Sequence, residues 1–553
     1  MDCTTIEFFN TLIIEIGKIL EHFKINLVIY NYLWYIVYIR GENMLAKIMS
    51  YGFWGIDGYE VKVEIDINAG IPGYDVVGLA DTAVKESKER VRAAIKNSGF
   101  NYPINKIIVN LAPAHTKKVG SLYDLPIATG ILVSNATISQ ACVKDYIILG
   151  ELSLDGTVSK VNGILPMLIS AKQRGFKKFI IPYENMIEAS FIDEVEVYAV
   201  RNLTEMVRFV SGEIQLPNIE SKSFYDLQHE FENKYDFKYV KGQASAKRAL
   251  EIAAAGGHNI LMIGPPGAGK TMMAKAFSGI LPDLTFDESL EVTKIHSVGG
   301  VLDPDKGIIA QRPVRTPHHT TTMIALTGGG HTAKPGEISL AHNGVLFLDE
   351  MPEYNRQTMD VLRQPMEDGH ITVARNAITV TYPANFILVG SMNPCPCGYY
   401  GSTTVKCKCQ PGAIHKYLNK ISGPLMDRID LHIEVEAITY DELTSRDLEE
   451  PSSEIKKRVN NARAIQLERY KGSNIYSNSK MGDKEIQEYC HLDEKCVQLI
   501  ERAFKVLNLS ARGYTRILKV ARTIADLDGC VDIDATHIQE AIQYRSMDKK
   551  FDV

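Results

Sequence analysis

The sequence predicts a multidomain α/β protein that combines an α+β N-terminal domain, a core built on a parallel sheet and a C-terminal helical domain. Three observations support this fold class. Strand and helix patterns alternate from residue 44 to about residue 212, and a strand, a glycine-rich loop and a helix follow one another within residues 259–279. After residue 440, patterns with the period of a helix dominate.

The bulk composition is that of an ordinary globular protein. The chain has 553 residues, enough for roughly three or four domains of ~150 residues each. A net charge of −6 argues against binding a polyanion with the whole surface, but it leaves room for a local basic site. Nine cysteines without a secreted-type framework indicate a reducing compartment, so we expect a cytoplasmic protein.

Residues 1–43 differ from the rest of the chain. The stretch INLVIYNYLWYIVYI, residues 25–39, is apolar and aromatic but shorter than the ~20 residues that a spanning helix needs. No small-residue cleavage pattern accompanies it. We therefore expect an N-terminal extension that is disordered or not native, such as translation begun upstream of a start at Met44. This interpretation is favoured over a membrane anchor, and no membrane partner is expected.

The N-terminal domain is predicted to span residues 44–212. Alternating apolar residues predict strands, and amphipathic runs predict helices, one of which is closed by Gly99. The predicted elements are strands at 59–68, 106–113 and 178–182 and helices at 83–99 and 165–175.

A charged segment without clear periodicity, residues 213–236, is predicted to be a linker. The core is predicted to span residues 237–440, and the helical domain residues 441–553. The helices predicted in the last domain are 453–472, 495–508 and 514–529.

The strongest motif is the run GPPGAGKT, which matches G-x-x-x-x-G-K-[ST] without a mismatch and lies between a strand pattern and a helix pattern. Glycines let backbone N–H groups approach phosphate oxygens, and the helix N-terminus adds the positive end of its dipole. Lys270 is expected to reach the β and γ phosphates, and the Thr271 hydroxyl to bind Mg²⁺. The predicted nucleotide-binding residues are Gly264, Pro265, Pro266, Gly267, Ala268, Gly269, Lys270 and Thr271.

A second motif supplies the acids that such a site needs. The run GVLFLDE, residues 344–350, is a buried-strand pattern that ends in two carboxylates. Asp349 is expected to complete the Mg²⁺ shell, and Glu350 to polarise the attacking water. Acidic residues at the carboxyl end of a strand lie where open α/β sheets bind ligands. Together with the glycine loop, this pair predicts a nucleotide triphosphatase.

Two further stretches bring the chain close to a known family. The strand pattern NFILVGSMN, residues 385–393, ends in Asn393, and the run PLMDRIDLHIEV contains Arg428. With these motifs the chain resembles the AAA+ ATPases, in the branch of magnesium-chelatase motor subunits and MCM helicases. The resemblance implies ATP as the nucleotide, with Asn393 as the sensor-1 residue and Arg428 as an arginine finger that reaches the neighbouring subunit. It also implies that Arg512 is the sensor-2 arginine of the lid, with Arg516 as the second candidate. The alternative for either role is a surface salt bridge.

The stretch EDGHITVARNAITVTYP, residues 367–383, predicts a β-hairpin with Arg375 at its tip, which is formed by residues 374–377. The same AAA+ branch carries a hairpin just ahead of the sensor-1 strand and an insertion in its second helix, for which residues 297–330 occupy the matching place. In ring-shaped relatives both elements point into the central pore. The resemblance therefore implies that Arg375 contacts DNA, and the alternative is a solvated arginine in a turn.

From Met44 onward, the chain resembles the YifB/ComM family of magnesium-chelatase-like proteins. The resemblance rests on the sequence motifs YDVVGLADTAVKESKERVRAAIKNSGF, RPVRTPHH and MNPCPCGYYG, at residues 74–100, 312–319 and 392–401. It implies a homo-hexameric, ATP-driven branch-migration helicase that acts on single-stranded or branched DNA in recombination or natural transformation.

The resemblance also implies that the N-terminal domain is similar to the proteolytic domain of Lon, a Ser-Lys peptidase. Alignment with the serine loop of Lon puts Leu122 at the nucleophile position, and the lysine position is occupied by Met167. Neither side chain can act as nucleophile or base. We therefore expect the fold without the peptidase activity.

The run CPCGYYGSTTVKCKC holds four of the cysteines in two C-x-C pairs. Four thiolates match tetrahedral zinc in ligand type, although the spacing is tighter than the usual C-x₂₋₄-C. A structural zinc site is the leading interpretation, and free thiols and a redox pair are the alternatives. The residues are Cys395, Cys397, Cys407 and Cys409.

Two other functions compete with the DNA motor. A magnesium-chelatase motor would share the core, but chelatase motor subunits lack the Lon-like domain, so porphyrin-chelatase partners are not expected. A protein-remodelling ATPase is the second competitor, because Lon-like domains also accompany protein-handling ATPases.

Overall fold

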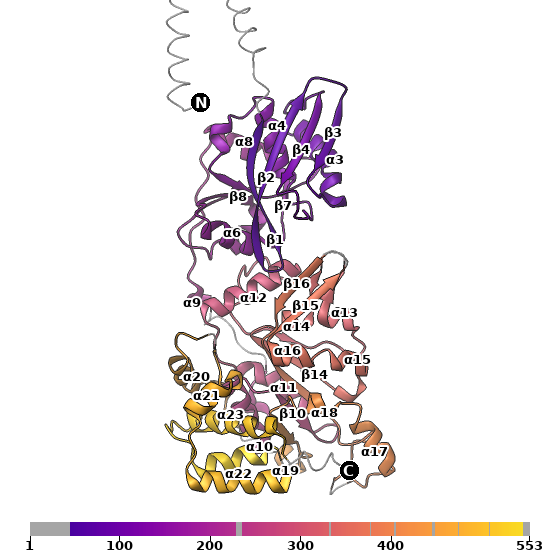
Figure 1. Ribbon diagram of the computed structural model, residues 1–553, viewed down its shortest axis with the longest axis vertical. Helices are drawn as coiled ribbons and strands as arrows, with labels where there is room; N and C mark the ends of the chain where they lie inside the picture. Colours follow the sequence, from indigo (N-terminus) through magenta and orange to yellow (C-terminus); the bar gives the residue numbers. More distant parts are fainter. Residues whose placement is uncertain are drawn as a thin grey trace, which may run out of the picture. The chain divides into compact units, whose positions relative to one another are not determined.

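The computed structural model describes residues 45–227, 235–330, 333–375, 378–402, 405–444, 448–473, 475–507 and 509–545. The predicted extension, residues 1–43, and the hairpin tip, residues 376–377, lie outside them. The chain divides into two compact units, coloured indigo to violet and magenta to yellow in Figure 1. The first unit consists of the chain up to Ser223 together with Gly300–Ile308, which is part of the predicted insertion. The second unit consists of the remaining residues. The predicted domain boundaries and the Lon-like assignment stay predictions.

The first unit is built on a seven-stranded mixed sheet in the order β3-β4-β2-β1-β5-β8-β9. Helices α4 and α6 both pack on β1 and β2, whose alternating apolar side chains point toward them. The strands are β1 (Ala46–Trp54), β2 (Asp57–Asn68), β3 (Gly73–Val77), β4 (Lys106–Ala112), β5 (Tyr146–Ile148), β8 (Lys178–Pro182) and β9 (Glu196–Val200). The main helices are α3 (Thr82–Asn97), α4 (Asp124–Ser134), α6 (Ile164–Gln173) and α8 (Leu203–Val210).

All five elements predicted for this region are confirmed, as β2, β4, β8, α3 and α6. Asp81 caps α3 by accepting the Val84 N–H, and Gly99 follows the helix with φ of +84°, a conformation that favours glycine. Leu122 and Met167 are both buried apolar side chains, 6% and 0% exposed.

The second unit contains a five-stranded sheet in the order β11-β14-β17-β10-β18, in which every pair of neighbours is parallel. Strand β17 therefore lies between the glycine-loop strand β10 and the acidic strand β14. The residues of β10, β14 and β17 are all buried, as continuous apolar runs in parallel sheets usually are. The strands are β10 (Ile260–Ile263), β11 (Val314–Arg315), β14 (Gly344–Leu348), β17 (Phe386–Met392) and β18 (Leu431–Glu434).

Helices complete this unit and confirm the predicted α/β class with a helical C-terminal region. Figure 1 shows the C-terminal helices grouped in yellow, and α20 and α23 pack on α10 of the core (Ala244–Gly256). The three helices predicted after residue 440 are confirmed as α20, α22 and α23. The C-terminal helices are α20 (Ser452–Arg469), α21 (Asp483–Tyr489), α22 (Glu494–Leu507), α23 (Ala511–Leu527) and α24 (Ala535–Gln543).

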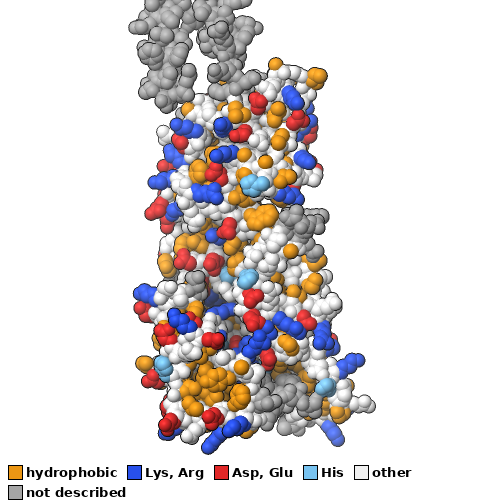
Figure 2. Space-filling model, viewed as in Figure 1, with side chains coloured by type: hydrophobic (Ala, Val, Ile, Leu, Met, Phe, Trp, Pro, Cys, Tyr) orange, Lys and Arg blue, Asp and Glu red, His pale blue; other side chains and the backbone are white. Residues whose placement is uncertain are grey.

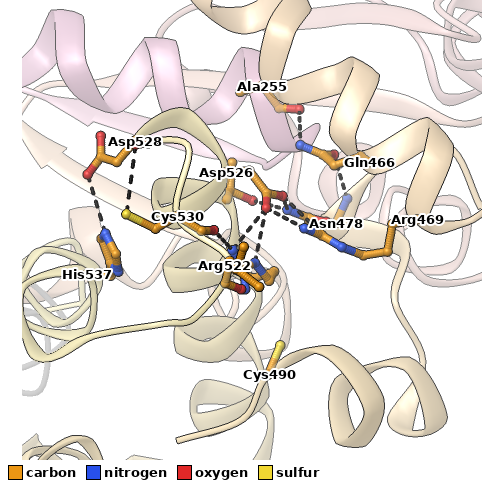
Figure 3. A network of polar contacts seen from close by, with 12 residues as sticks. Ala255, Gln466, Arg469, Asn478, Cys490, Arg522, Asp526, Asp528, Cys530 and His537 are labelled. Carbon is orange, nitrogen blue, oxygen red and sulfur yellow. Dashed lines mark hydrogen bonds and ion pairs between the residues drawn. The ribbon is translucent and has the colours of Figure 1, made fainter.

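A buried charged network joins these helices (Figure 3). The Asp526 carboxylate of α23 accepts two bonds from Arg469 of α20, at 2.5 and 2.8 Å, and one from Arg522 at 3.1 Å. Asn478 donates to the same carboxylate at 2.8 Å. Because removing one partner of a buried ion pair leaves an uncompensated charge, this network opposes separation of α20 from α23.

Candidate nucleotide-binding site

The glycine loop leads from β10 into α11 (Lys270–Phe277) through conformations that favour glycine. Gly267 and Gly269 have φ of +81° and +87°, in the left-handed region. Gly264 meets a different constraint, since a Cβ on it would lie 2.2 Å from the carbonyl oxygen of Val435. The loop therefore passes close to the end of β18, and α11 begins directly behind it, so that a helix N-terminus, which suits phosphate, faces the loop.

The Lys270 side chain is buried inside this loop. Its ammonium donates to the carbonyl oxygens of Gly264 and Pro265 at 2.6 and 2.9 Å, and to Asn393 Oδ1 at 3.1 Å. Burial lowers the pKa of Lys270, and the carboxylates of Asp349 and Glu350 partly offset this effect. The predicted phosphate-binding lysine and the predicted sensor-1 asparagine thus lie in direct contact.

The acids follow β14 at the same edge of the sheet. Thr271 Oγ1 donates to Asp349 Oδ2 at 2.9 Å. Ser391 of β17 donates to the other oxygen of this carboxylate and accepts the Glu350 N–H at 3.2 Å. Glu350 has φ of +52° and an exposed side chain. A hydroxyl beside a carboxylate is the oxygen donor set that suits Mg²⁺ together with phosphate.

Ser391 is a site residue that the sequence reasoning missed. It is fully buried in an otherwise apolar strand, two residues before Asn393. A polar residue inside a buried strand usually needs a hydrogen-bond partner, and this was the signal that could have identified it. Its hydroxyl fixes the orientation of the Asp349 carboxylate.

The structure brings the two predicted arginines together at a third residue, Glu367. The Arg428 guanidinium bonds to Glu367 Oε2, and Arg512 donates to Oε1 at 3.4 Å. The hydrogen bond from Arg428 lowers the pKa of Glu367. Within the described residues, neither arginine bonds to the loop that holds Lys270. Nothing in the local sequence around Glu367 signals this pairing.

Arg516, the second candidate for the lid arginine, has a different environment. It donates to Asp430 Oδ1 at 2.6 Å, and the Asp430 side chain is only 7% exposed. Asp430 also accepts the Asn259 N–H at 2.9 Å, close to His258. Arg516 therefore joins α23 to the start of β10 and β18.

The predicted hairpin is confirmed as β15 (His370–Arg375) paired with β16 (Ile378–Pro383). Arg375 ends β15, and its side chain lies outside the described part of the chain. The Tyr382 hydroxyl donates to the Ala333 carbonyl at 2.9 Å, so the hairpin lies against the short strand pair β12–β13 (Gly328–Gly329 and Lys334–Pro335).

Two arginines of the predicted insertion are already paired with acids. Arg312 bonds to both oxygens of Glu288 at 2.8 and 3.0 Å and is 9% exposed, and Arg315 contacts Glu337 at 2.6 Å. On the face drawn in Figure 2, basic and acidic side chains are interspersed.

The four clustered cysteines converge in space. The Sγ–Sγ distances are 3.3 Å for Cys395–Cys397, 3.7 Å for Cys395–Cys407 and 3.5 Å for Cys397–Cys407. The sulfur of Cys409 is the fourth, and all four sulfurs lie within 4.8 Å of one another. These separations exceed the ~2.05 Å of a disulfide. Four sulfurs at ~2.3 Å from one zinc ion would be about 3.8 Å apart. The cluster therefore fits a tetrahedral metal in size and ligand type.

Among the described residues, no helix combines the length and the apolar character that crossing a membrane requires.

Comparison with known proteins places the chain in a family. Three family models match: magnesium chelatase, subunit ChlI, over residues 236–443; subunit ChlI of Mg-chelatase over residues 63–185; and the subunit ChlI C-terminal model over residues 449–545. The magnesium-chelatase 38 kDa subunit of Rhodobacter capsulatus is 26% identical over 179 residues, 29% of this chain and half of that protein.

Other relatives match almost from end to end, among them the following two. Competence protein ComM of Haemophilus influenzae is 42% identical over 508 residues, 91% of this chain and 98% of that protein. The YifB protein of Escherichia coli is 41% identical over 498 residues, 90% of this chain and 96% of that protein. With its glycine loop, acidic strand and parallel sheet, the chain belongs to the ComM/YifB family of magnesium-chelatase-like AAA+ ATPases.

Proposed function

We propose that this chain is the subunit of a homo-hexameric ring that hydrolyses ATP to move DNA and drive branch migration. The observation that carries the ATPase part is the hydrogen-bonded set at one edge of the parallel sheet. Lys270 contacts Asn393 at 3.1 Å, and Thr271 contacts Asp349 at 2.9 Å. Family membership implies ATP and Mg²⁺ as the ligands, and these residue types fit both.

Each residue of the set has a separate task in this proposal. Lys270 neutralises the β and γ phosphates, while Thr271 and Asp349 hold Mg²⁺. Asn393 orients the attacking water, and Glu350 accepts its proton. The contact between Lys270 and Asn393 supports this arrangement because it puts the water-orienting amide beside the cation that binds the γ phosphate.

We propose that Arg428 and Arg512 act together on the nucleotide of a neighbouring subunit. Both bond to Glu367, so one acid holds two guanidinium groups side by side. Glu367 and Arg512 are 49% and 56% exposed, so an incoming subunit can reach the group from their side, while Arg428 lies deeper at 13%. Phosphate would replace Glu367 as the partner of both arginines, since guanidinium groups form the same bidentate, charge-assisted hydrogen bonds with phosphate as with carboxylate.

The DNA part of the proposal rests on the two strand pairs beside each other, β15–β16 and β12–β13. In the AAA+ branch that the chain resembles, a hairpin ahead of the sensor-1 strand and a helix-2 insertion point into the pore of a ring; here β15–β16 is that hairpin, and β12 ends the segment that matches the insertion. Arg375 would contact the phosphate backbone, which positions a nucleic acid without reading its sequence. The relative from Haemophilus influenzae carries the name competence protein.

The test is a gel-shift titration on forked, single-stranded and four-way DNA, with and without an ATP analogue, at two salt concentrations. We expect ATP-dependent binding whose affinity falls steeply with salt, because a phosphate contact releases counterions. Binding to an unfolded protein but to none of the DNAs would favour a protein-remodelling ATPase. Partnership with chelatase subunits would favour a magnesium-chelatase motor, whose 38 kDa subunit matches only 29% of this chain.

We also propose that the four cysteines bind one structural zinc ion. The convergence of Cys395, Cys397, Cys407 and Cys409 supports it, and four protein ligands leave no open coordination position for catalysis. Protein purified without chelator should contain about one zinc per chain. A metal-free protein of full stability would leave free thiols or a redox pair as the explanation.

A further inference from the structure

A turn inside the cysteine run, just after Cys397, lies directly against the phosphate loop. Gly398 has φ of +86°, and a Cβ on it would be 2.5 Å from Pro266 Cδ and 3.2 Å from Pro266 Cγ. The Gly398 N–H donates to the Cys395 carbonyl at 2.9 Å, which closes a tight turn. This turn presents the glycine backbone to the proline ring of the nucleotide site.

The cysteines hold this turn from both sides. Cys395 is fully buried, and its sulfur accepts the Tyr400 N–H at 3.3 Å. The sulfur of Cys407 accepts the Cys409 N–H at 3.4 Å. Backbone N–H groups directed at sulfur are the donors that stabilise a metal-bound thiolate. The turn that carries Gly398 is therefore part of the same cluster as the four sulfurs.

The far end of the cluster also returns to the nucleotide site. Helix α17 (Pro411–Leu418) begins two residues after Cys409 and carries Tyr417. The Tyr417 hydroxyl interacts with the backbone N–H of Asn393, and burial is the main cause that raises the pKa of Tyr417 to about 12. Asn393 is thus connected to the cluster by the chain on one side and by α17 on the other.

We propose that zinc bound by Cys395, Cys397, Cys407 and Cys409 fixes the Gly398 turn against Pro266, so that metal occupancy and nucleotide affinity are coupled. The inference rests on the zinc site and nucleotide site proposed above. The coupling is reciprocal by thermodynamic necessity: if zinc strengthens ATP binding, ATP must strengthen zinc binding by the same factor. Coupled sites commonly change each other's affinity by about 5- to 150-fold.

A pair of glycine variants tests the contact without removing a cysteine. Gly398→Ala and Gly401→Ala place the same side chain at similar backbone conformations, φ of +86° and +80°. A Cβ at Gly398 collides with Pro266, whereas one at Gly401 meets nothing within 4 Å. We expect both proteins to keep zinc, and Gly398→Ala alone to bind a fluorescent ATP analogue about 5-fold or more weakly. Equal affinities in the two variants would overturn the coupling.

The second experiment measures the coupling from the metal side. Zinc release from the wild-type protein to a chromogenic chelator is followed with and without Mg²⁺–ATP, and we expect ATP to slow it. Cys395→Ser/Cys397→Ser should lose the metal and bind nucleotide weakly. The control Cys142→Ser/Cys530→Ser, at two exposed cysteines, should change neither.

The outcomes separate three proposals: the zinc site, its coupling to the nucleotide site, and the ATPase function. Wild-type protein without zinc, but with ATP hydrolysis intact, overturns the metal site and leaves the ATPase proposal standing. Zinc release that is indifferent to ATP, in a protein that binds both, overturns the coupling alone. Absence of nucleotide binding in the wild-type protein overturns the proposed function itself.

Discussion

At the residue scale, the candidate site separates binding from chemistry. Lys270 is buried and bonded to Asn393, whereas Glu350 is exposed at the end of β14. Ser391 orients the Asp349 carboxylate between them. If Lys270 binds phosphate and Glu350 accepts a proton, as proposed, removing the first should weaken nucleotide binding and removing the second should slow hydrolysis.

We predict that Lys270→Ala loses ATP hydrolysis mainly by losing nucleotide affinity. Glu350→Gln should keep that affinity and lower turnover by roughly 10²-fold or more, the usual contribution of a general base. Equilibrium binding of an ATP analogue and single-turnover hydrolysis measure the two effects. Turnover by Glu350→Gln close to that of the wild-type protein would remove the proposed base.

At the element scale, two features connect the core to other parts of the system: a hairpin and a junction with the C-terminal helices. The first is the β15–β16 hairpin, held at its base by the bond from Tyr382 to Ala333. The second is the junction at which Arg516 of α23 bonds to Asp430 ahead of β18. In the proposed function the hairpin contacts DNA, whereas the junction attaches the C-terminal helices to the core.

For the hairpin, we predict that Arg375→Ala keeps most of the basal ATPase activity but loses DNA-stimulated activity and branch migration on every sequence. One lost phosphate contact should lower the slope of log affinity against log salt by about one unit. Arg502→Ala, at an exposed arginine of α22, is the control. If Arg375 only braces the hairpin, its variant would lower thermal stability and basal activity together.

For the junction, the pH dependence of stability tests the contribution of the Asp430 carboxylate. Burial by itself raises the pKa of Asp430, but the Arg516 guanidinium, His258 and the Asn259 N–H outweigh it and hold the pKa below the ordinary 3.8. A lowered carboxyl pKa stabilises the folded state above about pH 4, and the stabilisation is lost as the pH falls further. Asp430→Asn removes this stabilisation and deprives Arg516 of its ion pair with Asp430.

We therefore predict that Asp430→Asn lowers the free energy of unfolding by about 3 kcal/mol at pH 7. The difference from the wild-type protein should persist at pH 5 and narrow below pH 4, as measured by urea unfolding. Glu454→Gln, in an exposed pair with Lys457, should cost less than about 1 kcal/mol. A difference that does not depend on pH would exclude Asp430 ionisation as its source.

At the scale of the whole molecule, activity should depend on assembly. Family membership implies an oligomer, and Arg428 and Arg512 bond to Glu367 rather than to the phosphate loop of their own chain. A site whose arginines come from the neighbour is complete only in a ring. Hydrolysis per chain should then rise with protein concentration.

Mixing two inactive variants tests this dependence. Arg428→Ala should lower turnover by roughly 10³- to 10⁵-fold if it acts as an arginine finger. In mixtures with Lys270→Ala, some interfaces combine an intact phosphate loop with an intact arginine, and we expect part of the activity to return. Co-assembled mixtures that stay inactive would exclude action in trans.

The sequence by itself determined the parts that are local in the chain. Contiguous sequence patterns predict the glycine loop, the strand that leads to Asp349 and the helix α23. They can do so because the period of apolar residues and the spacing of a motif are properties of one segment. Strand β11 was missed because two residues, Val314–Arg315, are too few to show a period.

Only the tertiary structure decided the pairings between distant segments. Glu367 and Arg512 are 145 positions apart, and the contact of Gly398 with Pro266 joins two different loops. The position of β17 between β10 and β14 likewise cannot be derived from any single segment. Such contacts depend on how the whole chain folds back on itself. Sequence patterns therefore identify candidate residues, whereas their partners emerge only when parallel strands and loops meet at one edge of the sheet.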